Sequence, residues 1–373
     1  MSSSTSRRHF LASAFSLAAL GSSALLLTGC PGSGGSSPSP GGDASTAAPA
    51  TGPTPPAGGK KIKAGLVTDT GGVNDRSFNT MAYEGLQQAE KQLGAEIKVQ
   101  ESKAAGDYVQ NLTRFAQAGY GVVFAVGFKM QDALKEVAPR FPDVKFAIID
   151  GDAPDLPNCV SYKFREEQGS FLAGALAGAV TKTNTLGFIG GEEMPLIKKF
   201  EVGYKAGVQT TNPKAKVVVG YVGAFNDAQK GQELALSQMN GAKADILYHA
   251  AGESGVGVIK AVQAKGEGYY AIGVDKDQDA EAPGRVLTSM VKRVDVAVFQ
   301  VCQSVSTDAF KPGTVTVGLD EDGVGLSEMK YTKDKVPAEA LAKIEALKKQ
   351  ILEGKITPPT TDEELAAFKA PAA

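Results

Sequence analysis

Several residue types that carry chemistry are scarce in this chain of 373 residues. It contains no tryptophan, three cysteines and two histidines, His9 and His249. One histidine lies near the N-terminus and the other inside a predicted strand, which excludes a histidine-rich metal site and leaves little for a catalytic triad. Neither a Walker A sequence nor a dinucleotide-binding glycine pattern is present. We therefore expect no catalytic residue, no metal site and no cofactor.

The chain has one long apolar segment, residues 10–27, and serine and glycine interrupt it. A transmembrane helix needs about 20 predominantly apolar residues, so a membrane span is the weaker interpretation. Arg7 and Arg8 precede the segment and Leu-Thr-Gly-Cys ends it at Cys30. These features predict a lipoprotein signal peptide over residues 1–29, with Cys30 lipidated after cleavage. The paired arginines also fit a twin-arginine export motif, and the general secretory route is an equal alternative.

Residues 30–59 are rich in proline, glycine and serine and contain almost nothing that can be buried. Such a composition predicts a disordered linker, which as a random coil would span roughly 30 Å. Removal of residues 1–29 removes two arginines and leaves 37 basic against 41 acidic residues, a net charge of −4. A mildly acidic chain without a basic patch argues against a nucleic-acid partner.

Two cysteines remain besides Cys30. Cys159 and Cys302 could pair in an oxidising compartment, but we favour two separate buried thiols.

Short runs rich in valine, isoleucine and alanine alternate with amphipathic stretches from residue 60 onward. The predicted strands are 62–67, 96–101, 122–126, 145–149, 159–164, 185–189, 216–221, 245–249, 269–274, 285–288 and 314–317. The predicted helices are 78–93, 110–118, 131–139, 169–180, 198–209, 228–239, 256–264, 294–304 and 337–352. This alternation predicts an α/β fold with two parallel sheets, each covered by helices on both faces. Residues 318–325 are expected to form an acidic turn, and order is expected to end at Pro358 and Pro359.

Polar residues and glycines follow the predicted strands in both halves of the body. In open parallel sheets, ligands bind just beyond the carboxyl ends of the strands. Any one of these positions can be explained by turn and capping chemistry, and Ser77 or Ser254 could be a helix N-cap. Taken together they predict a site, whose candidate residues are Asp69, Asn74, Asp75, Phe78, Asn79, Phe128, Asp150, Phe225, Gly252 and Asp275.

Phe78 and Phe225 lie in polar turns, where an aromatic ring cannot serve as a helix cap. Two rings from opposite lobes can sandwich a flat ligand and contribute about 0.5–1.5 kcal/mol beyond the buried area. Carboxylates nearby would accept hydrogen bonds from hydroxyl or ring N–H groups and would repel phosphate. These features predict a neutral, flat, hydroxyl-bearing ligand.

The same residues carry a resemblance to a known family. The sequence resembles the basic membrane protein family of substrate-binding lipoproteins, whose best-understood members are purine nucleoside receptors of ABC importers. The resemblance covers residues 61–329. Its motifs are Asp69 with the turn at 74–79, the strand ends at 146–150 and 272–275, residues 168–174, Ala251-Gly252, Asp277-Gln278 and residues 287–292.

This resemblance implies a type I periplasmic binding protein, in which two doubly wound parallel-sheet lobes are joined by three hinge strands. The implied N-terminal lobe comprises residues 60–164 and 291–317. The implied C-terminal lobe comprises 165–290 and 318–356, followed by a tail at 357–373. The crossings are expected near 163–165, 288–291 and 317–319.

The resemblance also implies a role for each candidate side chain. The base would stack between Phe78 and Phe225, with Phe128 as a further apolar wall. Asp275 would accept the ribose hydroxyls, and Lys292 would lie at the hinge, where it would compensate buried acids or contact the ligand. Three first-lobe carboxylates would meet the edges of the base, namely Asp69, Asp75 and Asp150. The implied partners are an ABC permease and the membrane that anchors Cys30, and we expect a monomer facing the periplasm or the cell exterior.

Three alternatives stay open. The same fold could bind a sugar, a signalling molecule or an amino acid, although sugar receptors usually stack their ligands on tryptophan. Clustered aspartates could hold calcium in a nucleoside hydrolase. The protein could also be purely structural or adhesive.

Overall fold

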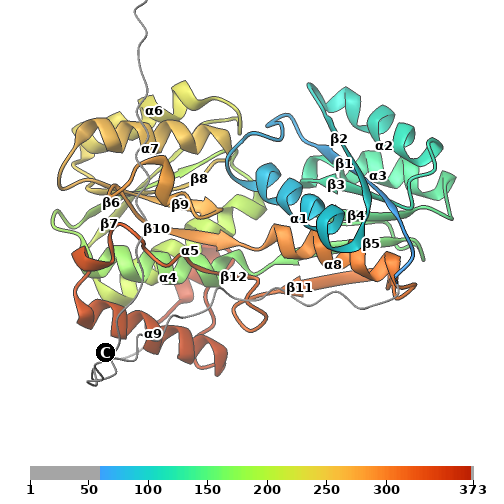
Figure 1. The fold of residues 1–373 in the computed structure, drawn as a ribbon. Helices are drawn as coiled ribbons and strands as arrows, with labels where there is room; N and C mark the ends of the chain where they lie inside the picture. The colour runs from blue at the N-terminus through green and yellow to red at the C-terminus, as the bar shows by residue number, and fades with distance from the viewer. Residues whose placement is uncertain (1–58, 371–373) are drawn as a thin grey trace, which may run out of the picture. The chain divides into compact units, whose positions relative to one another are not determined.

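The computed structural model describes residues 59–370. The predicted signal peptide, the lipidation site Cys30 and nearly all of the predicted linker lie outside the described residues. No helix within residues 59–370 is long and apolar enough to cross a membrane. The described body consists of two lobes, each built on a six-stranded sheet (Figure 1).

The first lobe contains a wholly parallel sheet of order β11-β5-β4-β3-β1-β2. Its strands are β1 (Lys63–Thr68), β2 (Glu96–Glu101), β3 (Val122–Val126), β4 (Lys145–Ile149), β5 (Cys159–Phe164) and β11 (Gly313–Val317). Its helices are α1 (Phe78–Leu93), α2 (Tyr108–Gln117), α3 (Gln131–Val137) and α8 (Val294–Ser306). The central strand β3 is apolar and buried along its whole length, as expected for a strand with helices on both faces.

The second lobe contains a sheet of order β12-β10-β9-β8-β6-β7. Its strands are β6 (Thr185–Gly190), β7 (Lys216–Tyr221), β8 (Ile246–Ala250), β9 (Tyr270–Asp275), β10 (Val286–Lys292) and β12 (Val324–Leu326). Its helices are α4 (Glu166–Val180), α5 (Pro195–Thr211), α6 (Ala228–Ser237), α7 (Glu253–Lys265), α9 (Ala338–Leu352) and α10 (Asp362–Ala367). All strand pairs are parallel except β10 with β12.

Shorter helical turns complete the two lobes. They are the 3₁₀ turns Ala105–Asp107, Phe128–Met130, Ala138–Arg140, Asp279–Glu281 and Lys333–Lys335, and a π turn at Gln238–Ala242.

The chain passes three times between the two sheets. It leaves the first sheet after β5 and enters α4, returns after β10 to α8, and leaves again after β11 to reach β12. The orange segments in Figure 1 show the second and third passages, where β10 leads into α8 and β11 runs back toward β12. Each lobe is therefore assembled from separated stretches of sequence, and residues next to these crossovers lie between the lobes.

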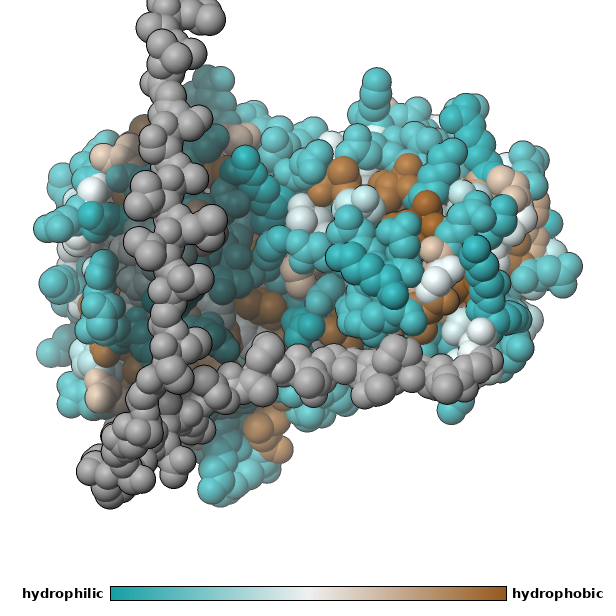
Figure 2. Space-filling view, in the orientation of Figure 1, coloured by the Kyte–Doolittle hydropathy of each residue, from teal (hydrophilic) through white to brown (hydrophobic). Residues whose placement is uncertain are grey.

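The described surface carries few large hydrophobic side chains. Three are exposed within residues 59–370, namely Val315, Tyr331 and Leu352. Figure 2 agrees, since the face that it draws is largely hydrophilic with hydrophobic residues in small groups.

The predicted α/β fold is confirmed, and α1 begins and ends where it was predicted. Three predictions of local structure are wrong. β10 continues four residues beyond the predicted 285–288, because its last residues pair with β12. The expected turn forms at 319–322, but the last two residues of the predicted range 318–325 begin β12, which is too short to give a strand signal.

Order also does not end at Pro358 and Pro359. Both prolines are buried, α10 follows them, and Thr361 caps that helix by accepting a hydrogen bond from the Glu364 amide at 3.2 Å. The Phe368 ring then packs edge-on against Phe171, with 6.0 Å between ring centroids. Cys159 and Cys302 are free and buried, which confirms the favoured prediction of two separate thiols.

Candidate functional site

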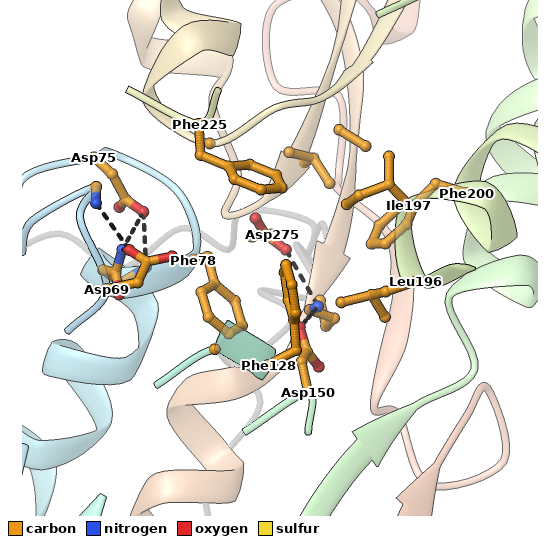
Figure 3. A pocket seen from close by; sticks show the side chains of 17 residues that line it. Asp69, Asp75, Phe78, Phe128, Asp150, Leu196, Ile197, Phe200, Phe225 and Asp275 are labelled. Carbon is orange, nitrogen blue, oxygen red and sulfur yellow. Dashed lines mark hydrogen bonds and ion pairs between the residues drawn. The ribbon is translucent and has the colours of Figure 1, made fainter. Parts of the chain in front are cut away.

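A cavity lies at the carboxyl ends of the strands of both lobes. Its empty volume is about 580 Å³, a figure that includes space open to solvent. Figure 3 shows aromatic rings and carboxylates from both lobes around this space. The lining residues are Asp69, Gly71, Asp75, Phe78, Asn79, Gly127, Phe128, Asp150, Leu196, Ile197, Phe200, Phe225, Ala250, Gly252, Val274, Asp275 and Lys292.

Ten of the eleven residues predicted to bind a ligand line this cavity. The exception is Asn74, whose side chain is exposed and outside the lining. The wall formed by Leu196, Ile197 and Phe200 was missed. These residues lie in the first turns of α5, and an apolar residue that faces a cavity looks in sequence like one that faces a core.

Asp75 organises the loop that leads into α1. Its carboxylate accepts hydrogen bonds from the backbone amides of Ser77, Asn79 and Thr80 at 2.9, 2.9 and 3.0 Å. The Thr80 hydroxyl and the Asn79 amide group donate to the same carboxylate at 3.0 and 3.1 Å. Both oxygens are thus engaged within the loop. Burial outweighs these hydrogen bonds and raises the pKa of Asp75 to about 6.

Asn79 links the two aspartates of this loop. Its Nδ2 donates to Asp69 Oδ1 at 2.8 Å and to Asp75, and the Gly71 amide donates to the same Asp69 oxygen at 2.9 Å. These bonds fix the Asn79 side chain so that its Oδ1, which is buried, has no partner within residues 59–370. Burial raises the pKa of Asp69 above its usual value, against the opposing effect of the Asn79 hydrogen bond.

Lys292 lies at the end of β10, among carboxylates from both lobes. Its Nζ is 2.5 Å from Asp150 Oδ2, 3.6 Å from Glu166 Oε1 and 3.8 Å from Asp275 Oδ1. Its side chain is only 2% exposed. Burial opposes the charged form, but the three carboxylates prevail and raise the pKa of Lys292. Lys292 is therefore an ammonium, and it also lies 4.9 Å from the centroid of the Phe78 ring.

Asp150 and Asp275 occupy matching positions in the two lobes. Asp150 directly follows β4 and Asp275 ends β9, and both have a φ of 63°. Positive φ is unfavourable for a residue with a side chain, and such strain clusters at functional sites. Asp150 Oδ1 is buried and has no partner among the described residues.

Aromatic rings from both lobes face the cavity. Phe78 begins α1, and Phe225 reaches in from the opposite lobe (Figure 3). The Phe128 ring stands edge-on to Phe225, with 6.5 Å between centroids. A Cβ atom at Gly191 would lie 2.3 Å from the Phe225 ring, so this glycine makes room for it.

The lobes contact each other around the cavity. The Ser77 hydroxyl donates to Asp275 Oδ2 at 2.6 Å, and Gln278 Nε2 donates to the Arg76 carbonyl at 3.0 Å. Arg76 forms an ion pair with Glu281 at 2.6 Å. Ser77 therefore bonds across the cleft instead of capping its helix, and the structure represents a closed cleft.

The Bmp family model, described as ABC transporter substrate-binding protein PnrA-like, matches residues 62–361. The chain belongs to this family. It is an ABC transporter substrate-binding protein, which works with a membrane permease and is not an enzyme. No group of residues suited to hold a metal ion occurs in the described part of the chain.

Individual relatives are similar over most of their length. The chain is 39% identical over 320 residues to a CD4+ T-cell-stimulating antigen of Listeria monocytogenes, covering 80% of this chain and 88% of that protein. It is 36% identical over 319 residues to the ABC transporter nucleoside-binding protein BmpA of Lactococcus lactis, covering 80% and 89%. A solved ABC transporter solute-binding protein of Aeropyrum pernix superposes with a TM-score of 0.76 at 28% identity, covering 82% of this chain and 96% of that one. The type I periplasmic binding protein fold is thereby confirmed.

Proposed function

We propose that this Bmp-family protein is a purine nucleoside receptor that delivers its ligand to an ABC permease. Asn79 and Asp150 carry the proposal, because both residues line the cavity and the Oδ1 atom of each is buried with no hydrogen-bond partner within residues 59–370. A buried acceptor that lacks a hydrogen bond is costly, so a ligand with donor groups would stabilise the site. A purine nucleoside supplies them on a flat base and on a ribose.

In this proposal the base lies between Phe78 and Phe225, and Phe128 closes one side. Asp69 and Asp150 accept hydrogen bonds from the base edge together with Asn79. Asp75 has no free oxygen, so its task is to hold the loop that presents Asn79.

Asp275 accepts the ribose hydroxyls, because it lines the cavity opposite the first-lobe acceptors. Lys292 holds Asp150 and Asp275 in place from the hinge. The carboxylates outnumber the cavity's single cation, which disfavours phosphorylated ligands. The 36% identical nucleoside-binding relative supports the same ligand class.

We further propose that Cys30 carries the lipid that tethers the body to the outer side of the membrane. The predicted linker after Cys30 would then give the body reach toward its permease. Intact-mass measurement of protein from membranes tests this. We expect a lipid adduct and loss of residues 1–29 in the wild type, and retention of the leader in Cys30→Ser.

Mass spectrometry of the ligand released on denaturation tests the receptor proposal. We expect a purine nucleoside in about equimolar amount from protein purified without added ligand. Release of a sugar or an amino acid would contradict the proposal.

A further inference from the structure

The Lys292 cluster contains more carboxylates than its cation can neutralise. Asp150, Glu166 and Asp275 all approach the same ammonium to within 3.8 Å. The next cation, Lys199, lies 3.5 Å from Glu166 Oε2, but its side chain is one-third exposed and solvent screens it. Uncompensated buried charge is strongly unfavourable. One of the three carboxylates should therefore be neutral in the closed form.

Glu166 is the least stabilised of the three. Asp150 accepts a hydrogen bond from Lys292 at 2.5 Å, and Asp275 accepts one from Ser77 at 2.6 Å. Glu166 is 1% exposed, and neither of its side-chain oxygens has a hydrogen-bond partner within residues 59–370. Burial outweighs the attraction of Lys292 and raises the pKa of Glu166 to about 7.

The cluster joins the two lobes at their crossovers. Asp150 follows β4 of the first lobe, whereas Asp275 ends β9 of the second. Glu166 begins α4 directly after the first crossover strand, and Lys292 ends β10 at the second. Separation of the lobes would draw Asp150 and Asp275 apart and admit water to the cluster, so its full set of charges meets only on closure.

We propose that Glu166 is a positioning residue that takes up a proton when the lobes close on the ligand. Protonated Glu166 leaves the Lys292 ammonium to hold Asp150 and Asp275, which line the cavity. Two further titratable groups lie near Glu166 in the described residues, namely Lys199 from α5 and the Tyr248 hydroxyl from β8. The proposal rests on the proposed function in that a nucleoside serves as the probe.

The direction of the pH effect follows from proton linkage. If the closed form binds a proton that the open form lacks, closure is favoured at low pH. Affinity should then fall as the pH rises from about 5 to about 7, by at most about tenfold per pH unit for one proton, and level off above that range.

Isothermal titration with adenosine or guanosine, whichever binds more tightly, measures this proton directly. At pH 6, the binding enthalpies measured in phosphate and in bis-tris differ by the number of protons taken up multiplied by the difference in ionisation enthalpy of the two buffers. We expect nearly one proton per ligand for the wild type and close to none for Glu166→Gln, which mimics the protonated form. Glu167→Gln is the matched control. Glu167 is buried on the same helical turn, but it lines a pocket formed with the C-terminal segment of its own lobe and lies outside the Lys292 cluster. It should keep the wild-type proton uptake.

Equal binding enthalpies in the two buffers for the wild type, or unchanged uptake in Glu166→Gln, would overturn the inference. Absence of binding heat with both nucleosides would instead contradict the proposed function as a nucleoside receptor. In that case the compound released on denaturation and identified by mass spectrometry replaces the nucleoside in the same two-buffer titration. Uptake of nearly one proton that is lost in Glu166→Gln would support the inference, and equal enthalpies in the two buffers would contradict it.

Discussion

Asp75 illustrates how a predicted contact residue becomes a scaffold for its neighbours. Five hydrogen bonds from three following residues converge on its carboxylate. They hold the loop in the one arrangement that aims Asn79 and Phe78 at the cavity. The ligand contacts proposed for this loop therefore depend on a residue that need not touch the ligand.

The ring of Phe225 gives the most direct test of the stacking arrangement. Phe225→Ala should weaken nucleoside binding at least tenfold, about 1.4 kcal/mol, because the second-lobe half of the ring pair is lost. Titration calorimetry measures the change. Phe310→Ala is a suitable control, since this ring lies outside the cavity against Lys145. Equal losses in both variants would contradict a specific stacking role.

His249 should control acid stability from within β8. It is fully buried, and burial lowers its pKa to about 4 from an ordinary 6.5. The folded state thus keeps the imidazole neutral, and stability is lost as the pH falls from about 6.5 toward 4. The loss should approach about 3 kcal/mol.

Urea unfolding at a series of pH values measures this contribution of His249. His249→Gln should remove the pH-dependent difference, whatever its effect at neutral pH. Parallel pH profiles for the two proteins would show that His249 does not carry the effect.

Individual site residues could be predicted where the residue type is not explained by the needs of the local secondary structure. A carboxylate after a buried strand, such as Asp150 or Asp275, and a phenylalanine in a polar turn stand out in sequence. Asn74 belongs to the same turn, yet it points to solvent, because the turn alternates between cavity and exterior. Glu166 gave no signal, since an acid in the first turn of a helix is ordinary.

At the scale of elements, α4 and α5 pack unusually closely. A Cβ atom added to Gly207 would lie 1.9 Å from the Phe171 carbonyl oxygen, and one at Gly174 would lie 2.0 Å from that of Tyr204. Glycines from both helices thus remove the side chains that would hold the backbones apart. This contact positions α5, whose first turns form the apolar wall of the cavity.

Gly207→Ala should destabilise the fold although alanine favours helices. The added methyl group forces the helices apart, at a cost of about 1–3 kcal/mol. Chemical denaturation measures the loss. Gly106→Ala serves as the control, because nothing lies within 4 Å of the Cβ position there. A Gly207→Ala protein as stable as the control would contradict the close-packing argument.

The elements that sequence reasoning missed are those held by tertiary contacts. β12 has three residues and exists because β10 offers an edge for antiparallel pairing. α10 is short and follows two prolines, and it persists because it packs on α5. The long alternating segments were predictable, since periodicity and turn residues agree there.

At the scale of the whole molecule, closure unites two chemically incomplete half-sites. The first lobe supplies Asn79, Asp150 and the rings of Phe78 and Phe128, and the second supplies Asp275 and the opposing Phe225 ring. Lys292 and Glu166 lie where the chain crosses between them. Contacts across the cleft join residues far apart in the sequence, such as Ser77 and Asp275, which are 198 positions apart. Sequence spacing alone therefore could not give the geometry of the whole site.

Titration of ligand-stripped protein with adenosine, guanosine, inosine, cytidine and ribose is the decisive test of nucleoside binding. We expect saturable heat at one site per chain for at least one purine nucleoside, with cytidine weaker and ribose weaker still. Absence of binding by every nucleoside, or binding of ribose as tight as that of any nucleoside, would contradict the proposed function.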